Sequence, residues 1–366
     1  MNISAGEIIS NRSRPFDPFF SICIPQYNRT DFLIKSCESY VQQDFKDLEL
    51  CISDDLSNDG RDADLIEFLK NSNLVYSYRK NSKILRYDGN LRQAISMSSG
   101  KYVVLMGNDD ELGDPDTLRF IERELKRHDP VAVAITNYRE TLTGQIVRRI
   151  QKAGIVGSGA VIAASNFRNY SFVSGIVLDG EAARGASTDR YDGSEMYQMY
   201  LGTRLVATGG RLLAIDRVCV TKDVQIPGQV VDSYRRRPRI WPCPIRERPL
   251  PMGRLLEVVA GGLEPCSTQP DLKRNSFNVV RQLYRFTYPF WVFEYRAVQS
   301  WRFALGVYLS LRPPRISRTV SFSLFARCRL WMMYLQYGIA ALTIPVFVFR
   351  RLRPRLYAFA KRLQLA

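Results

Sequence analysis

Two short apolar segments of this chain each end in a pair of aspartates. Residues 51–55 read CISDD, and residues 102–110 read YVVLMGNDD. An apolar run that stops at acids is typical of a buried parallel strand, which delivers its last side chains to the carboxyl-terminal edge of a sheet. Ligands bind at that edge in open α/β sheets. Four carboxylates there repel one another unless a cation lies between them, so the pattern predicts a divalent metal that carries a nucleotide diphosphate.

The first 136 residues alternate between strand-like and helix-like segments. Strands are predicted at 20–24, 48–53, 74–78, 102–106 and 131–136. Helices are predicted at 32–42, 62–71, 89–98 and 115–126. This alternation indicates an α/β fold, with right-handed βαβ units on a mainly parallel sheet flanked by helices. Residues 140–225 are less regular, and we expect short antiparallel strands there with one helix at 194–201.

The composition restricts the chemistry. His128 is the only histidine, which excludes His-rich metal sites and the usual Ser-His-Asp or Cys-His catalysis. Any metal should therefore be a hard, oxygen-ligated ion such as Mg²⁺ or Mn²⁺. The seven cysteines form no C-x-x-C pair, which fits reduced thiols in a cytosolic protein. No signal peptide is expected from the N-terminal residues.

Charge is divided unevenly along the chain. Of the net charge of +16, residues 1–225 contribute −2 (28 Lys/Arg, 30 Asp/Glu) and residues 226–366 contribute +18 (24 Lys/Arg, 6 Asp/Glu). No acidic residue follows Glu294. This division indicates regions with different roles. We predict a lead-in at 1–19, a catalytic domain at 20–225, a proline-rich connector at 226–275 and basic, hydrophobic helices at 276–366.

The last of these regions is predicted to associate with a membrane. Residues 330–349 carry no charge and are long enough for a spanning helix, with a hairpin that enters one leaflet as the alternative. Residues 277–311 are aromatic and Arg-bearing, which is typical of an interfacial helix, here broken at Pro289. A buried helical subdomain would not explain the absence of acids. Nucleic-acid binding would not explain the apolar run, so we expect an anionic membrane surface as partner and no nucleic acid.

Four motifs follow one another in a fixed order. They are PQYNR at 25–29, DDLSNDG at 54–60, an Asn- and Gly-containing segment at 81–95, and GKYVVLMGNDD at 100–110. Over about residues 20–205 this set closely resembles the family 2 glycosyltransferases, inverting enzymes of GT-A fold. It is most similar to sugar transferases of bacterial O-antigen and capsule assembly, including abequosyltransferase-like enzymes. The resemblance implies a Rossmann-like sheet, a nucleotide diphosphate sugar donor and Mn²⁺ or Mg²⁺ as cofactor.

The same resemblance implies roles for single residues. Pro25 and Tyr27 should border the nucleotide, and Asp55 should hold the base. Asp109 should face the ribose or sugar. Asp110 should coordinate the metal, and Asp109 is the second expected metal ligand. The metal would neutralise charge on the departing diphosphate. The other residues expected at the donor site are Asn28, Arg29, Asp54 and Asn108.

One segment departs from the family pattern. Where many relatives have Asn-x-Gly after the third strand, this chain has Ile84-Leu85-Arg86. We predict that Arg86 lies near the diphosphate and supplements the metal, because a guanidinium suits phosphate geometry. A solvated surface arginine is the alternative.

An inverting transferase needs a general base for the attacking hydroxyl. By resemblance to the family, Glu195 aligns best with the catalytic carboxylate, and Asp192 is the second candidate. A helix N-terminus stabilises a carboxylate as the anion, which suits a base. The alternative is a plain capping acid in the first turn.

These features predict a metal-dependent inverting glycosyltransferase at the cytoplasmic face of the cell membrane. It would move a sugar to a hydroxyl of a lipid-linked glycan, with polyprenyl diphosphate as the carrier, in bacterial surface polysaccharide synthesis. One alternative is a non-catalytic nucleotide- or glycan-binding scaffold at the membrane. Another is a sugar nucleotidyltransferase, although the glycine-rich loop of many such enzymes is missing here.

Overall fold

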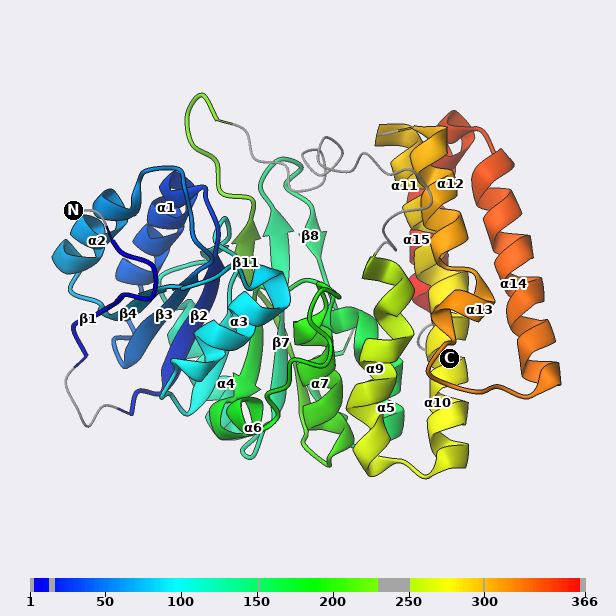
Figure 1. The fold of residues 1–366 in the computed structure, drawn as a ribbon, viewed down its shortest axis with the longest axis horizontal. Helices are drawn as coiled ribbons and strands as arrows, with labels where there is room; N and C mark the ends of the chain where they lie inside the picture. The colour runs from blue at the N-terminus through cyan, green and yellow to red at the C-terminus, as the bar shows by residue number, and fades with distance from the viewer. Residues whose placement is uncertain (1–2, 13–16, 151, 230–250, 299, 363–366) are drawn as a thin grey trace. The chain divides into compact units, whose positions relative to one another are not determined.

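The computed structural model describes residues 3–12, 17–150, 152–229, 251–298 and 300–362 (Figure 1). The chain divides into two compact units, Met1–Ser233 and Tyr234–Ala366. The first is built on a sheet with helices, and the second is helical.

The first unit has a mixed sheet of eleven strands within its described residues. Along the main path the order is β1-β4-β3-β2-β5-β10-β7-β11-β6, with β8 on β7 and β9 on β11. The parallel half consists of β4 (Val75–Lys80), β3 (Leu48–Asp54), β2 (Phe20–Gln26) and β5 (Tyr102–Leu105). This half matches the four strands predicted between residues 20 and 106.

The other half of the sheet mixes directions. Strand β10 (Ile176–Asp179) runs antiparallel to both β5 and β7 (Val133–Glu140), and β11 (Leu212–Lys222) runs parallel to β7. The shorter strands are β1 (Ile8–Ser10), β6 (Glu111–Leu112), β8 (Ile146–Val147) and β9 (Gly154–Gly157). The insertion of β10 beside β5 brings a second chain segment next to the Asn-Asp-Asp motif.

Helices connect the strands of the first unit. They are α1 (Thr30–Val41), α2 (Asp62–Asn71), α3 (Arg86–Ser96), α4 (Thr117–Arg127), α5 (Ala160–Asn166), α6 (Gly180–Gly185) and α7 (Tyr197–Ala207). The core is apolar on both sides of the parallel strands, which explains their continuous hydrophobic runs: Ile22, Leu50 and Val104 are fully buried. The helix predicted at 194–201 begins three residues later than expected, at Tyr197.

The second unit is a bundle of helices. Its main elements are α9 (Leu255–Leu263), α10 (Gln269–Gln282), a π-helical turn (Leu283–Thr287), α11 (Tyr288–Val298), α12 (Trp301–Ser310), α13 (Pro313–Ile316), α14 (Leu324–Thr343) and α15 (Val346–Arg362). Four tyrosines meet at its centre with ring centroids 4.5–6.0 Å apart: Tyr284, Tyr288, Tyr308 and Tyr334. Such contacts stabilise the bundle beyond area burial alone.

Three expectations for this region need correction. The irregular connector at 226–275 contains α9 and the start of α10, while its residues 230–250 lie outside the described part. Part of the aromatic side of residues 277–311 is core, because Tyr284, Tyr288 and Phe293 are buried. The helix expected over 330–349 ends at Thr343, since Pro345 lacks the N–H that would continue it.

Candidate active site

Three adjacent parallel strands end at the same edge of the sheet. The register pairs Gln26 of β2 with Asp54 of β3, and Cys23 of β2 with Leu105 of β5. The ends of these strands and the loops that follow them carry the PQYNR, DDLSNDG and GNDD motifs. The topology therefore brings the predicted motifs together at one edge, as expected for a ligand-binding edge of an α/β sheet.

Three carboxylates meet beside β5. Oxygen atoms of Asp109, Asp110 and Asp223 all lie within 4.8 Å of one another. Asp223 directly follows β11, and its N–H donates to Asp110 Oδ1 at 3.0 Å. The Ser174 hydroxyl donates to Asp110 Oδ2. Asp223 was not among the predicted residues, because it lies 113 positions from Asp110 and the pairing of β11 with β7 and β6 brings it back to this edge.

The three carboxylates are partly neutralised by two cations. Arg29 Nη1 lies 2.5 Å from Asp109 Oδ2, and Lys222 pairs with Asp223. Burial first, and the charge of Asp109 second, raise the pKa of Asp110 to about 7. Burial also raises the pKa of Asp109, against the opposing effect of Arg29. Three carboxylates this close to one another repel, so the site favours an added positive ion.

The donor set fits a hard divalent metal. Three carboxylates and a serine hydroxyl are oxygen donors of the kind that Mg²⁺ and Mn²⁺ prefer. Asp110 and Asp223 are buried, so their positions are set by the fold. Asp110 and Asp109 were the predicted metal ligands, and Asp223 is the third candidate.

Ser174 is itself held by Arg149, which follows strand β8. Arg149 Nη2 donates to the Ser174 carbonyl, and its guanidinium lies 5.4 Å from the ring centroid of Tyr138 and 5.0 Å from that of Phe172. Burial lowers the pKa of Arg149 to about 10, so the side chain stays cationic at neutral pH. Arg149 thus positions Ser174, the hydrogen-bond donor to Asp110.

Binding of Mn²⁺ should be pH-dependent. Because Asp110 must lose a proton with a pKa of about 7 to bind the ion, we expect affinity to fall roughly tenfold for each pH unit below 7. At pH 6 binding should release close to one proton. Titration calorimetry in two buffers of different ionisation enthalpy measures that release. An affinity that does not change between pH 5.5 and 7.5 would contradict this assignment.

Both predicted carboxylates at the end of β3 have partners within the protein. Asp54 accepts from the Ser57 N–H at 2.6 Å and from the Tyr78 hydroxyl at 3.1 Å, and it is buried. Asp55 accepts from the N–H groups of Leu85 and Arg86 at 2.5 and 2.9 Å. Asp54 closes its own loop, and Asp55 fixes the start of α3.

The residues after β2 link this loop to the next motif. Asn108 Nδ2 donates to Gln26 Oε1 at 2.8 Å and to the Asn28 carbonyl at 3.2 Å. Asn28 Oδ1 accepts from the Asn58 N–H at 2.8 Å. Asn28 and Asn108 therefore connect the three loops by hydrogen bonds. Pro25 is half-buried, and Tyr27 is 52% exposed at the same edge.

Arg86 lies at the first position of α3 with a left-handed backbone, φ 58°. Its N–H contacts Asp55, and its side chain is exposed. The structure thus places Arg86 beside one predicted donor residue, in keeping with either of its two predicted roles.

The two candidate bases lie on the loop before α7. Asp192 forms a two-point ion pair with Arg92 of α3, at 2.5 and 2.8 Å. Glu195 is exposed and has φ 59°, two residues before the helix instead of in its first turn. The alternative role predicted for Glu195, a capping acid in the first turn of the helix, is therefore wrong, because a different residue caps α7.

Asp88, a residue of α3, caps the N-terminus of α7 although the two are far apart in the sequence. Its carboxylate is fully buried and accepts from the N–H groups of Glu195, Met196 and Tyr197 at 2.8, 2.9 and 3.0 Å. Burial raises the pKa of Asp88, and these three hydrogen bonds oppose that rise. The bond to Glu195 holds a non-glycine residue in the left-handed region, which is rarely populated without such support.

Replacement of Asp88 by Asn should displace the Glu195 loop. An amide loses one of the two acceptor oxygens, so one buried N–H is left without its partner at a cost of about 1–3 kcal/mol. We expect a lower melting temperature and a kcat about tenfold lower, with nucleotide affinity unchanged. The matched control is Asp64→Asn, on the exposed side of α2, which should alter neither property. Equal losses in kcat and nucleotide affinity would argue against a loop-specific role.

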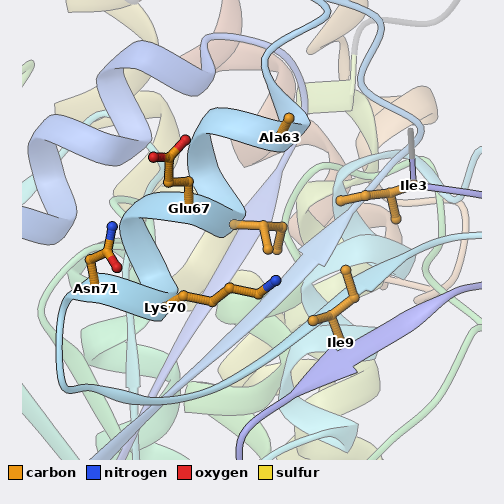
Figure 2. A pocket seen from close by; sticks show the side chains of 7 residues that line it. Ile3, Ile9, Ala63, Glu67, Lys70 and Asn71 are labelled. Carbon is orange, nitrogen blue, oxygen red and sulfur yellow. The ribbon is translucent and has the colours of Figure 1, made fainter. Parts of the chain in front are cut away.

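A separate cavity of about 320 Å³ lies elsewhere in the first unit (Figure 2). It is bordered by Ile3 and Ile9 near the N-terminus and by α2 residues that include Ile66 and Lys70. None of the predicted site residues lines it. The acidic site is therefore defined by its side chains and by the sheet edge, not by this cavity.

A family model described as glycosyl transferase family 2 matches residues 21–175. Abequosyltransferase RfbV of Salmonella typhimurium is 36% identical over 107 residues, 29% of this chain and 32% of that protein. A GalNAc(5)-diNAcBac-PP-undecaprenol beta-1,3-glucosyltransferase of Campylobacter jejuni is 34% identical over 95 residues, 26% of this chain and 31% of that protein. The chain thus matches about a third of the length of these curated relatives.

Solved structures share the fold at low identity. S. aureus TarS 1-349 in complex with UDP has a TM-score of 0.58 and 13% identity, covering 88% of this chain and 90% of that one. The mannosyltransferase PcManGT from Pyrobaculum calidifontis in complex with GDP-Man and Mn²⁺ has a TM-score of 0.51 and 16% identity, covering 96% and 88%. These likenesses confirm the predicted GT-A fold class.

Proposed function

We propose that this chain, whose residues 21–175 match the glycosyl transferase family 2 model, transfers a sugar from a nucleotide diphosphate sugar to an acceptor hydroxyl with inversion. The observation that carries the proposal is the buried carboxylate triad at the edge where β2, β3 and β5 end. A divalent ion bound there would neutralise the departing nucleotide diphosphate.

The protein's own residues would bind and orient the donor. Tyr27, half exposed at the sheet edge, offers a ring face to the base. Arg29, paired with Asp109, supplies a positive charge beside the triad. Asp55 keeps one lone pair on each oxygen after its two backbone contacts, which leaves it able to accept from a base N–H or a ribose hydroxyl.

Glu195 is the proposed general base. Its carboxylate would take the proton from the acceptor hydroxyl as that oxygen attacks the anomeric carbon and the nucleotide diphosphate leaves. Its loop is fixed by Asp88, while Asp192 is held in an ion pair with Arg92. Asp192 is the second candidate.

We further propose that the acceptor is a lipid-linked glycan, on polyprenyl diphosphate, and that the protein works at the cytoplasmic face of the cell membrane in bacterial surface polysaccharide synthesis. Two observations support this. One curated relative is named for an undecaprenol-diphosphate-linked acceptor. The second unit combines an excess of positive charge with exposed apolar side chains on α14 and α15.

A two-stage experiment tests the proposal. A thermal-shift panel of nucleotide diphosphate sugars with Mn²⁺ identifies the donor, because a bound ligand raises the melting temperature. That donor, labelled in its sugar, is then incubated with lipid-linked acceptors. Transfer of label to the lipid phase supports the proposal. Binding without turnover would point to a scaffold, and synthesis of the nucleotide sugar would point to a nucleotidyltransferase.

A further inference from the structure

The exposed face of α14 carries an apolar stripe. Leu324, Cys328, Trp331, Leu335 and Ile339 follow one another at spacings of three or four residues, and all five are exposed. Side chains at this spacing share one face of a helix. Phe325 and Met332 widen the stripe, with exposed fractions of 72% and 61%. More than half of the large hydrophobic side chains exposed in the described chain lie between residues 324 and 356.

The opposite face of α14 belongs to the core of its own unit. Leu330, Tyr334 and Ala341 are buried there. The Tyr334 ring stacks on Tyr308 with centroids 4.5 Å apart, and a Cβ at Gly338 would lie only 2.0 Å from the Tyr288 hydroxyl. One side of α14 is therefore fixed against the bundle, and only the other side is available to a partner.

Arginines lie on both margins of the stripe. At about 100° per residue, the apolar side chains span an arc of roughly 120°, with Arg327 on one margin and Arg329 on the other. Both are exposed. Long basic side chains at such positions bury their stems and keep the charge in the headgroup layer. Further exposed arginines follow in α15, at Arg350, Arg351 and Arg355.

The end of α14 holds a charge that is costly to place in the hydrocarbon interior of a bilayer. Arg296 of α11 donates to the carbonyls of Ala341 and Ile344 at 2.6 and 2.8 Å. In the described residues no single helix has the length and hydrophobicity to cross a membrane. Leu324–Thr343 and Val346–Leu352 pass that test as a pair, with a bend of 107° between them.

From these observations we propose that the α14 stripe inserts into one leaflet of an anionic bilayer, with the helix axis in the membrane plane. The inference rests on the membrane association proposed above and names the surface that contacts the membrane. A second copy of the chain is a poorer occupant, because the arginine margins of two copies would repel each other. An anionic leaflet matches the apolar stripe and its basic margins together.

Labels at the two ends of the stripe test the orientation. Leu324 and Ile339 are each replaced by Cys and labelled with an environment-sensitive fluorophore, after the other exposed thiols at Cys266 and Cys328, and Cys243, are changed to Ser. The full chain is bound to vesicles of phosphatidylcholine and phosphatidylglycerol. The two positions are about 22 Å apart along the helix, from a rise of 1.5 Å per residue. Depth-dependent lipid quenching should place both labels at the same shallow depth.

A large difference in depth between the two labels would show a spanning helix and overturn the proposal. No quenching, combined with a dimeric mass in solution, would assign the stripe to a second copy and overturn it as well.

Variants that add negative charge to the stripe provide a second test of the proposal. Leu335→Glu with Ile339→Glu should lower partition to anionic vesicles at least tenfold, while Leu142→Glu, an exposed apolar position of the first unit, should leave it unchanged. Both variants should keep the Mn²⁺ and nucleotide binding of the unaltered protein. Vesicle binding that survives the double variant overturns the proposal. Loss of nucleotide binding in the unaltered protein would instead contradict the proposed function.

Discussion

Replacing Asp110 by Asn is expected to lower kcat for sugar transfer by roughly a thousandfold, equivalent to about 4 kcal/mol of transition-state stabilisation. Asp110 is the most buried acid of the triad, and its two oxygens are oriented by the Asp223 N–H and the Ser174 hydroxyl. Asn preserves the shape of the side chain and removes the negative charge. A ligand for the metal is lost without a cavity being made.

The folded state should survive this substitution. Burial raises the pKa of Asp110, which means that the fold disfavours its charged form, so a neutral amide should leave the melting temperature equal or higher in the absence of metal. Asp114→Asn is the matched control, because Asp114 lies four residues away with its side chain 79% exposed. Mn²⁺ titration and steady-state kinetics measure the two effects. Full activity in Asp110→Asn would remove the metal assignment.

The second large effect is expected for Glu195→Gln. Loss of a general base lowers kcat by about 10²–10⁴-fold. Glu195 is exposed and its backbone is held by Asp88, so Gln should occupy the same loop without loss of stability. Nucleotide and Mn²⁺ affinities should be unchanged, because neither involves this side chain. Transfer to the acceptor, followed with saturating donor, is the measurement.

Asp192→Asn separates the two candidate bases. Because Asp192 is ion-paired with Arg92, its loss should affect the loop more than the chemistry, and we expect less than a tenfold change in kcat. The reverse ranking, with Asp192→Asn severely impaired and Glu195→Gln nearly active, would transfer the base role to Asp192.

Strand and helix order in residues 20–136 could be predicted because local signals suffice there. Buried parallel strands read as unbroken apolar runs, and the motifs directly after them must reach the same edge. For the same reason Asp109 and Asp110 could be placed together at this edge from the sequence. Asp54 and Asp55 were also placed at this edge, although the structure shows that backbone and Tyr78 contacts occupy much of their hydrogen-bonding capacity.

Residues brought in by long-range pairing could not be predicted. Asp88 has no local feature that marks it, since its partners lie more than a hundred residues away. The later start of α7 follows from the same contact, because Asp88 replaces the local cap that the residues near Ser194 were expected to supply. In the second unit, the hydropathy of residues 330–349 could not show that Tyr334 and Gly338 face a tyrosine cluster while Leu335 and Ile339 face outward.

The sequence by itself determined the α/β class, the order of the motifs and the carboxylates at the end of β3 and in the loop after β5, because periodicity and composition act over a few neighbouring residues. Only the tertiary structure decided that Asp223 completes the triad, that Asp88 fixes the Glu195 loop and that α14 exposes one apolar face. These features depend on which distant segments pair and on which side of a helix is covered. Such contacts arise from the packing of the whole unit and leave no local pattern in the chain.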